Sequence, residues 1–155
     1  MHRIAQLGAL ALGLLAPNAT AASAHAAEPV PFTITEQVNF ATGENTFTAT
    51  GPLCPSGTFV DDPQVFAPSR PVPAPGLNLL IRTVYTCDDG SGSFYALKHV
   101  FLTFGDNAVT NTGPIQLLGG TGAYSQLVGH GVDNGVSTNP DTGVGEISGF
   151  ASLHQ

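Results

Sequence analysis

The chain has 155 residues, with 4 Lys and Arg against 11 Asp and Glu, and a formal net charge of −7 at pH 7. Nucleic acids and anionic membrane surfaces are bound through clustered basic side chains, so this balance argues against both as partners. The acidity itself identifies no partner, because solubility is a sufficient explanation for it.

The first 26 residues have the features of a secretory signal peptide. A basic start is followed by the apolar run Ile4–Ala16 and by an A-x-A cleavage pattern at 24–26. The run is shorter than the roughly 20 residues needed to span a bilayer, although an uncleaved N-terminal anchor is an alternative. We expect a secreted protein with a mature chain that starts near Ala27 or Glu28. Residues 27–155 would form one domain.

Apolar and polar residues alternate along most of the remaining chain, which predicts strands rather than helices. The first predicted strands are Phe32–Phe40, Thr46–Gly51 and Ser56–Val60. Residues 62–76 contain five prolines, and because proline cannot donate to a strand ladder we expect a loop there. Two forms of this loop remain open: an ordered loop over the mouth of a barrel, or a flexible exposed one.

Two strands rich in aromatic and β-branched residues follow this loop, and three more complete the set. They are predicted at Asn78–Thr86, Ser93–Phe104, Pro114–Leu118, Ala123–Val132 and Gly145–Leu153. The sequences at 111–113 (NTG) and 139–143 (NPDTG) are typical of turns. Seven or eight short antiparallel strands predict an all-β fold, either a sandwich or a closed barrel.

The two cysteines, Cys54 and Cys87, lie on either side of the proline-rich segment. An even number of cysteines in an exported chain predicts a disulfide. Closing the loop between them would stabilise the fold by about 3–4 kcal/mol in the chain-entropy model. A free catalytic thiol is the alternative, which export disfavours.

The stretch from Gly119 to Gly131, GGTGAYSQLVGHG, contains five glycines in thirteen residues. A dinucleotide fingerprint would need a third glycine where Ser125 stands, followed by a helix, and a P-loop would need Gly-Lys-Ser/Thr. Both are missing, so we expect no phosphate site. The glycines are expected instead to allow positive φ at a turn or bulge and close passage of strands; they are Gly119, Gly120, Gly122, Gly129 and Gly131.

This tract, G-G-T-G-x-Y followed by G-x-G, is preceded by PIQLL and followed by a last strand, GEISGFA (Gly145–Ala151). In this order it resembles the allene oxide cyclase and dirigent superfamily, as a secreted bacterial-type member, over Phe32–Leu153. The resemblance implies an eight-stranded antiparallel β-barrel with an apolar lumen, often a homodimer or homotrimer. Members of that superfamily direct a cyclisation or radical coupling by shaping a bound apolar substrate.

Three charged residues, Glu36, Arg82 and Lys98, alternate with apolar neighbours along predicted strands. Buried charge is unfavourable unless paired, so each is expected to be a lumen group with a partner or an outward residue at an oligomer interface. A structural ion pair would place charges in the same way. The strand of Arg82 is apolar on both faces, which leaves its direction open.

The neighbouring face of the strand that carries Lys98 presents Tyr95 and His99. Both are candidates to donate a hydrogen bond to a substrate carbonyl or to act as general acid or base. Together with Glu36, Arg82 and Lys98 they form the set of candidate catalytic residues.

Metal ligation has little support in the sequence. The histidines of the mature region lack the spacing of a zinc site. Asp61-Asp62 and Asp88-Asp89 are candidate oxygen ligands, because the disulfide would bring the two pairs together, but their spacing is not that of an EF-hand loop. We expect no metal and no cofactor.

Two classes of function fit these observations. The leading hypothesis is a secreted barrel that binds a hydrophobic small molecule in its lumen and steers a cofactor-free cyclisation or coupling. The alternative is a non-enzymatic exported carrier or an envelope-associated interaction protein. An open cavity faced by Glu36, Arg82 or Lys98 would favour binding or catalysis, whereas a lumen filled by Phe and Leu side chains would leave an interaction protein.

Overall fold

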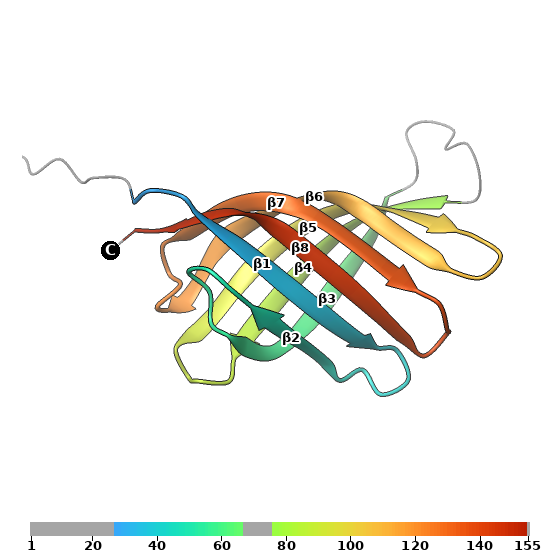
Figure 1. Cartoon of the computed structure of the whole chain (residues 1–155), viewed down its shortest axis with the longest axis horizontal. Coiled ribbons are helices and arrows are strands. Elements are labelled where there is room, and N and C mark those ends of the chain that lie inside the picture. The colour runs from blue at the N-terminus through green and yellow to red at the C-terminus, as the bar shows by residue number, and fades with distance from the viewer. Residues whose placement is uncertain (1–26, 67–75, 155) are drawn as a thin grey trace, which may run out of the picture.

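The computed structural model describes residues 27–66 and 76–154, which form a closed antiparallel barrel of eight strands (Figure 1). Each strand pairs with its neighbours in sequence, and β1 closes the barrel against β8. The strands are β1 (Val30–Asn39), β2 (Asn45–Ala49), β3 (Ser56–Phe66), β4 (Gly76–Cys87), β5 (Gly92–Phe104), β6 (Val109–Gly122), β7 (Leu127–Ser137) and β8 (Thr142–Leu153). The prediction of an all-β fold is confirmed, and of its two architectures the barrel is the one observed.

Two segments of the sequence that carry predictions fall outside these residues. They are the predicted signal peptide, 1–26, and the part of the proline-rich segment at 67–75. Within the described ranges, no helix has the length and apolar character needed to cross a membrane.

The prediction of a loop from Asp62 onward is wrong for its first five residues, which continue β3 as far as Phe66. Pro63 stands opposite Ile81 of β4. On the other side of β3, the pairing with β2 extends only to Phe59 within the described residues. The end of β3 is therefore an edge on that side, where a proline without an N–H group is tolerated.

A second difference concerns the glycine-rich half of the chain. Residues 111–113, predicted as a turn, lie inside β6 and pair with β7 over Asn111↔Gly135 to Gly113↔Asp133. Strand partners on both sides outweigh the local turn preference of this sequence. The turn between β6 and β7 lies further on, at 123–126.

The glycine tract is a structural element of that turn, as predicted. Gly122 has a φ of +57° at the end of β6, a conformation that residues with a Cβ rarely adopt. Gly120 lies so close to the carbonyl oxygen of Ser93 on β5 that a Cβ would collide with it. These glycines let the backbone of β6 bend past β5.

One half of the barrel is filled by aromatic side chains. Tyr85 and Phe94 stack with ring centroids 4.6 Å apart, and Phe47 meets Tyr85 edge-on at 5.1 Å. Tyr124, from the β6–β7 turn, packs on Phe94 at 5.5 Å and closes this end. Edge-to-face and offset pairs of this kind add to the stabilisation from apolar burial.

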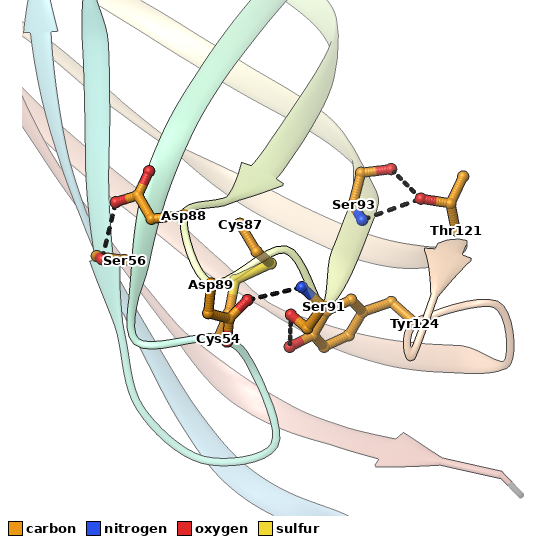
Figure 2. Close-up of a disulfide and its surroundings, with 9 residues drawn as sticks. All are labelled: Cys54, Ser56, Cys87, Asp88, Asp89, Ser91, Ser93, Thr121 and Tyr124. Carbon is orange, nitrogen blue, oxygen red and sulfur yellow. Dashed lines mark hydrogen bonds between the residues drawn. A yellow bond between two sulfur atoms is a disulfide. The ribbon is translucent and has the colours of Figure 1, made fainter.

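The predicted disulfide is present at the same end of the barrel (Figure 2). Cys54, from the β2–β3 connection, is bonded to Cys87 at the end of β4, with an S–S distance of 2.07 Å. Both side chains are buried against the aromatic core. Hydrogen bonds between Ser56 and Asp88 and between Ser91 and Tyr124 tie the adjoining turns together. The bridge therefore joins the β2–β3 connection covalently to the end of β4 at the filled end of the barrel.

Candidate functional site

The other half of the barrel contains an open cavity of about 830 Å³. Its mouth is bordered by the β5–β6 hairpin at 105–109 and the β7–β8 hairpin at 137–140. Aliphatic side chains form the walls, and charged side chains form the floor where the cavity meets the aromatic core. The aliphatic residues that line the cavity include Val38, Leu79, Ile81, Val100 and Leu102.

The cavity exists because the inward positions of the strands change in size along the barrel. Toward the closed end they carry rings such as Phe32, Phe59 and Phe94, whereas toward the mouth they carry Val and Ile. On β8 the inward positions 143 and 145, which line the cavity, are glycines. Small side chains leave the space that large ones fill elsewhere.

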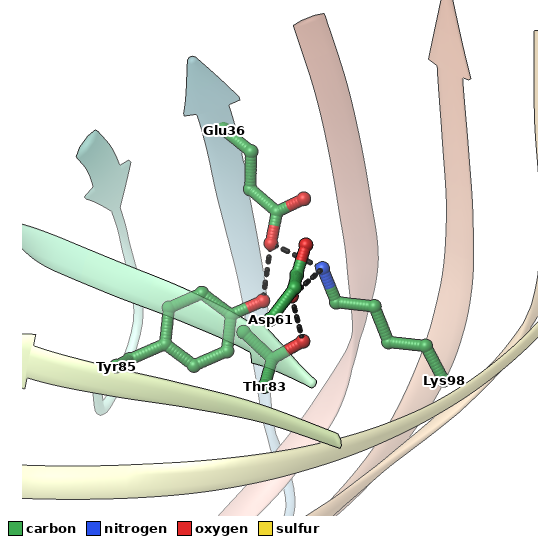
Figure 3. A network of polar contacts seen from close by, with 5 residues as sticks. All are labelled: Glu36, Asp61, Thr83, Tyr85 and Lys98. Atoms are coloured by element: carbon green, nitrogen blue, oxygen red, sulfur yellow. Dashed lines mark hydrogen bonds and ion pairs between the residues drawn. The ribbon is translucent and has the colours of Figure 1, made fainter. Parts of the chain in front are cut away.

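Glu36 of β1 and Lys98 of β5 meet at the floor, across the lumen (Figure 3). Lys98 Nζ donates to Glu36 Oε1 at 2.5 Å, and the hydroxyl of Tyr85 donates to the same oxygen. Glu36 and Lys98 are only 4% and 2% exposed. Burying such a pair is costly unless further hydrogen bonds satisfy it, and Tyr85 provides one.

The pKa values of two floor residues follow from these contacts. Burial raises the pKa of Tyr85 well above its ordinary value, and the charge of Glu36 raises it further, so its hydroxyl remains a donor. Burial lowers the pKa of Lys98, but the charges of Glu36, Asp61 and Asp133 more than offset this and leave it raised. Lys98 therefore remains an ammonium ion.

Asp61 of β3 adds a second carboxylate to the floor. Its Oδ1 accepts a hydrogen bond from the hydroxyl of Thr83 at 2.5 Å and lies 3.9 Å from Lys98 Nζ. Lys98 thus lies between two carboxylates, which hold its ammonium group. The rings of Phe59 and Tyr85 also face Lys98 Nζ, with centroids at 5.5 and 5.7 Å.

Asp133 of β7 is the third carboxylate of the floor and is 3% exposed. Burial is the largest effect on its pKa and raises it from 3.8 to about 6; the charge of Lys98 and a hydrogen bond from Asn111 lower the pKa, and the charges of Glu36 and Asp61 raise it. Its Oδ1 has no hydrogen-bond partner among the described residues. Asp133 is therefore a buried carboxyl beside the cavity, with one oxygen that accepts no hydrogen bond in the described part of the chain and a proton that exchanges near neutral pH.

Because the pKa of Asp133 is raised in the folded state, ionisation of this carboxyl lowers the free energy of unfolding. Between pH 3.8 and about 6 the folded state binds more protons at this site than the unfolded state, so the stability falls as the pH rises through that window. Asp133→Asn removes the ionisation and is expected to raise the free energy of unfolding at pH 7.5 by up to about 3 kcal/mol. Urea unfolding at pH 7.5 and pH 3.5 should show this gain only at the higher pH; an equal effect at both would contradict the raised pKa.

Of the five candidate catalytic residues, Glu36 and Lys98 face the cavity. Arg82, Tyr95 and His99 do not, because they occupy outward positions on β4 and β5, where Arg82 lies over the ring of Tyr95 at 5.3 Å from its centroid. On β4 the inward residues are Leu79, Ile81, Thr83 and Tyr85, so of the two directions left open for Arg82 the structure shows the outward one. Once Lys98 points inward on β5, strand alternation sends its neighbour His99 outward.

Three floor residues, Asp61, Tyr85 and Asp133, are absent from the candidate catalytic residues chosen by sequence. Asp61 follows the buried Phe59 by two positions, so alternation along a strand would place both on the same face. The prolines after Asp61 led to the prediction of a loop from residue 62, and the predicted strand therefore ended at Val60, before Asp61. Asp133 alternates with glycines at 129, 131 and 135, which give no apolar signal for an inward face. Both belong to strands longer than those predicted.

The acidic pairs considered as calcium ligands do not come together. Asp61 faces the lumen, Asp88 accepts a hydrogen bond from Ser56, and Asp89 accepts one from the backbone of Ser91. In residues 27–66 and 76–154, no three His, Cys, Asp or Glu side chains are grouped closely enough to hold a metal ion.

The floor combines a fixed cation, a neutral hydroxyl donor and a carboxyl that exchanges its proton near neutral pH. Such a set can accept a hydrogen bond from a bound molecule and can move a proton at it without a cofactor. No family model, curated protein or solved structure matches this chain. The resemblance to the allene oxide cyclase and dirigent superfamily, and the oligomeric state it implies, therefore stay predictions.

Proposed function

We propose that this protein is an exported barrel that binds an apolar small molecule in the open half of its lumen. The observation that carries the proposal is the cavity of about 830 Å³ with aliphatic walls and a charged floor. Small-molecule sites are typically concave spaces of about 300–1,000 Å³ with apolar walls and a few polar groups that orient the ligand. The Cys54–Cys87 bridge is compatible with an extracellular location.

Binding in the lumen is favoured over a purely interaction-based role. A lumen filled by Phe and Leu side chains would have left no room for a ligand, and here the filling stops at Tyr85 and Phe59. Among ligand-binding roles, the steering of a cofactor-free cyclisation or coupling draws its support from Asp133, whose pKa of about 6 suits proton exchange with a bound substrate. A carrier needs the same cavity but no proton exchange.

Filling the cavity provides the test of binding. Ile81 lines the cavity from β4, and Ile81→Trp is expected to weaken binding of a neutral apolar probe, 1-decanol, by at least about tenfold, because the indole occupies the space of the ligand. The measurement is isothermal titration calorimetry at pH 7.5.

The matched control is Leu80→Trp, which adds the same ring one position away, on the outer face of β4. It should bind 1-decanol as the unmodified protein does. If 1-decanol binds equally well to all three proteins, it occupies some other surface and the lumen proposal is wrong. If it binds to none of them, the open half is no site for apolar molecules.

A further inference from the structure

We propose that the end of the ligand that reaches the floor of the cavity is a protonated amine, received by the free oxygen of Asp133. This inference rests on the proposed function and adds the chemical class of the ligand: an apolar body with one cationic, hydrogen-bond-donating end. Three observations support it: the charge of the cavity, the partners of Lys98 and the position of Asp133.

The charge of the cavity is the first observation. Among its described lining residues, four are acidic and one is basic. The acidic residues are Glu36, Asp61, Asp133 and, at the rim in the β5–β6 hairpin, Asp106; the basic residue is Lys98. The walls between rim and floor are aliphatic, so these charges act on a bound molecule with less screening than they would in water. A cationic end is attracted along the whole path, and an anionic end is repelled.

The contacts of Lys98 are the second observation. Its ammonium group donates to Glu36 at 2.5 Å, lies 3.9 Å from Asp61, and is 2% exposed. A ligand carboxylate would have to displace one of these partners and leave a buried carboxylate without its counterion, which is strongly unfavourable. Lys98 is therefore a structural cation of the floor and not a free anion-binding group.

The position of Asp133 is the third observation. Asp133 lines the cavity, is 3% exposed, and has an Oδ1 that accepts no hydrogen bond within the described part of the chain. Buried acceptors in folded proteins nearly always have a partner. A ligand ammonium would supply both the missing donor and a compensating charge, and such charge-assisted hydrogen bonds are about twice as strong as neutral ones. A hydroxyl would supply the donor alone.

Decylamine, 1-decanol and decanoate each carry an unbranched alkyl chain and differ in the end group. Comparing their binding therefore distinguishes a cationic, a neutral and an anionic end. Isothermal titration calorimetry of the full mature chain at pH 7.5 is expected to show decylamine binding at least about tenfold more tightly than 1-decanol, and decanoate binding most weakly. Asp133→Asn is expected to abolish the preference for the amine while leaving the affinity for 1-decanol within about threefold. The variant should fold, because it removes a destabilising charge.

The control variant is Glu146→Gln, which removes one negative charge from the outer face of β8 and should leave the preference for the amine intact. If decanoate or 1-decanol binds as tightly as decylamine, the amine inference is overturned while lumen binding stands. If the preference survives Asp133→Asn, or if decylamine still binds Ile81→Trp, Asp133 is not the receiving group and the inference is likewise overturned. If none of the three probes binds, the proposed function fails together with it.

Discussion

Replacing Lys98 with methionine is expected to lower the free energy of unfolding by about 3–5 kcal/mol at pH 7. Methionine keeps the approximate shape of the side chain but removes the cation that faces Glu36, Asp61 and Asp133. Glu36, which is 4% exposed, would then be a buried carboxylate without a counterion. Urea unfolding followed by circular dichroism measures the loss.

The pH dependence of this loss distinguishes charge from packing. Lys98 now lowers the pKa of Asp133, so without it the carboxyl would hold its proton over a wider pH range. Protonated carboxyls need no counterion, and the deficit of Lys98→Met should therefore shrink as the pH falls from 7 toward 4. A deficit that is equal at both pH values would mean that the lysine acts through packing.

Two further variants control for this experiment. Arg82→Met removes a basic side chain from the outer face of the neighbouring strand β4 and should change the free energy of unfolding by less than about 1 kcal/mol. The double variant Glu36→Gln with Lys98→Met removes both charges of the pair and should be more stable than Lys98→Met alone. If the double variant is less stable, the two residues do not act as a pair.

Reducing the Cys54–Cys87 disulfide is expected to lower the free energy of unfolding by about 3–4 kcal/mol, from the chain entropy of the loop that it closes. The cysteines are 33 positions apart and the bridge joins the β2–β3 connection to the end of β4. For a domain of this size the loss corresponds to roughly 10 °C or more in the melting temperature. Differential scanning calorimetry with and without reductant measures it.

The double variant Cys54→Ala with Cys87→Ala provides the control for the reductant itself. Its melting temperature should equal that of the reduced protein and should not respond to further reductant. Titration of free thiols in the native, unreduced protein should find none, and the detection of two would refute the bridge. Because the bridge lies at the filled end, binding of 1-decanol at the other end should survive reduction at temperatures where the protein remains folded.

Two-residue alternation showed from sequence that Glu36 and Lys98 each share a strand face with apolar residues, but it left open whether that face points into the lumen. Their partnership was not accessible from sequence. The two residues are 62 positions apart, on strands β1 and β5 that share no ladder. Only the closure of the barrel between β1 and β8 brings them together across the lumen, and closure is a property of the whole chain.

What the sequence left open or missed has local physical causes. The direction of Arg82 stayed open because Leu80, Ile81 and Val84 make both faces of β4 apolar, so that alternation carries no direction there. Asp133 was missed because glycines occupy the same face of β7 and supply no hydrophobic pattern. The structure resolves both cases through the strand register, in which Arg82 pairs with Leu97 and Asp133 pairs with Gly113 and Ile147.

The packing of one half of the barrel makes the other half a dead end. A molecule that enters between the β5–β6 and β7–β8 hairpins meets Tyr85 and Phe94 beyond the floor and must leave by the way it came. A long polymer cannot thread through such a channel and can present only a chain end. For a ligand bound as we propose, the floor would contact the terminal group and the depth of the walls would set a maximum length.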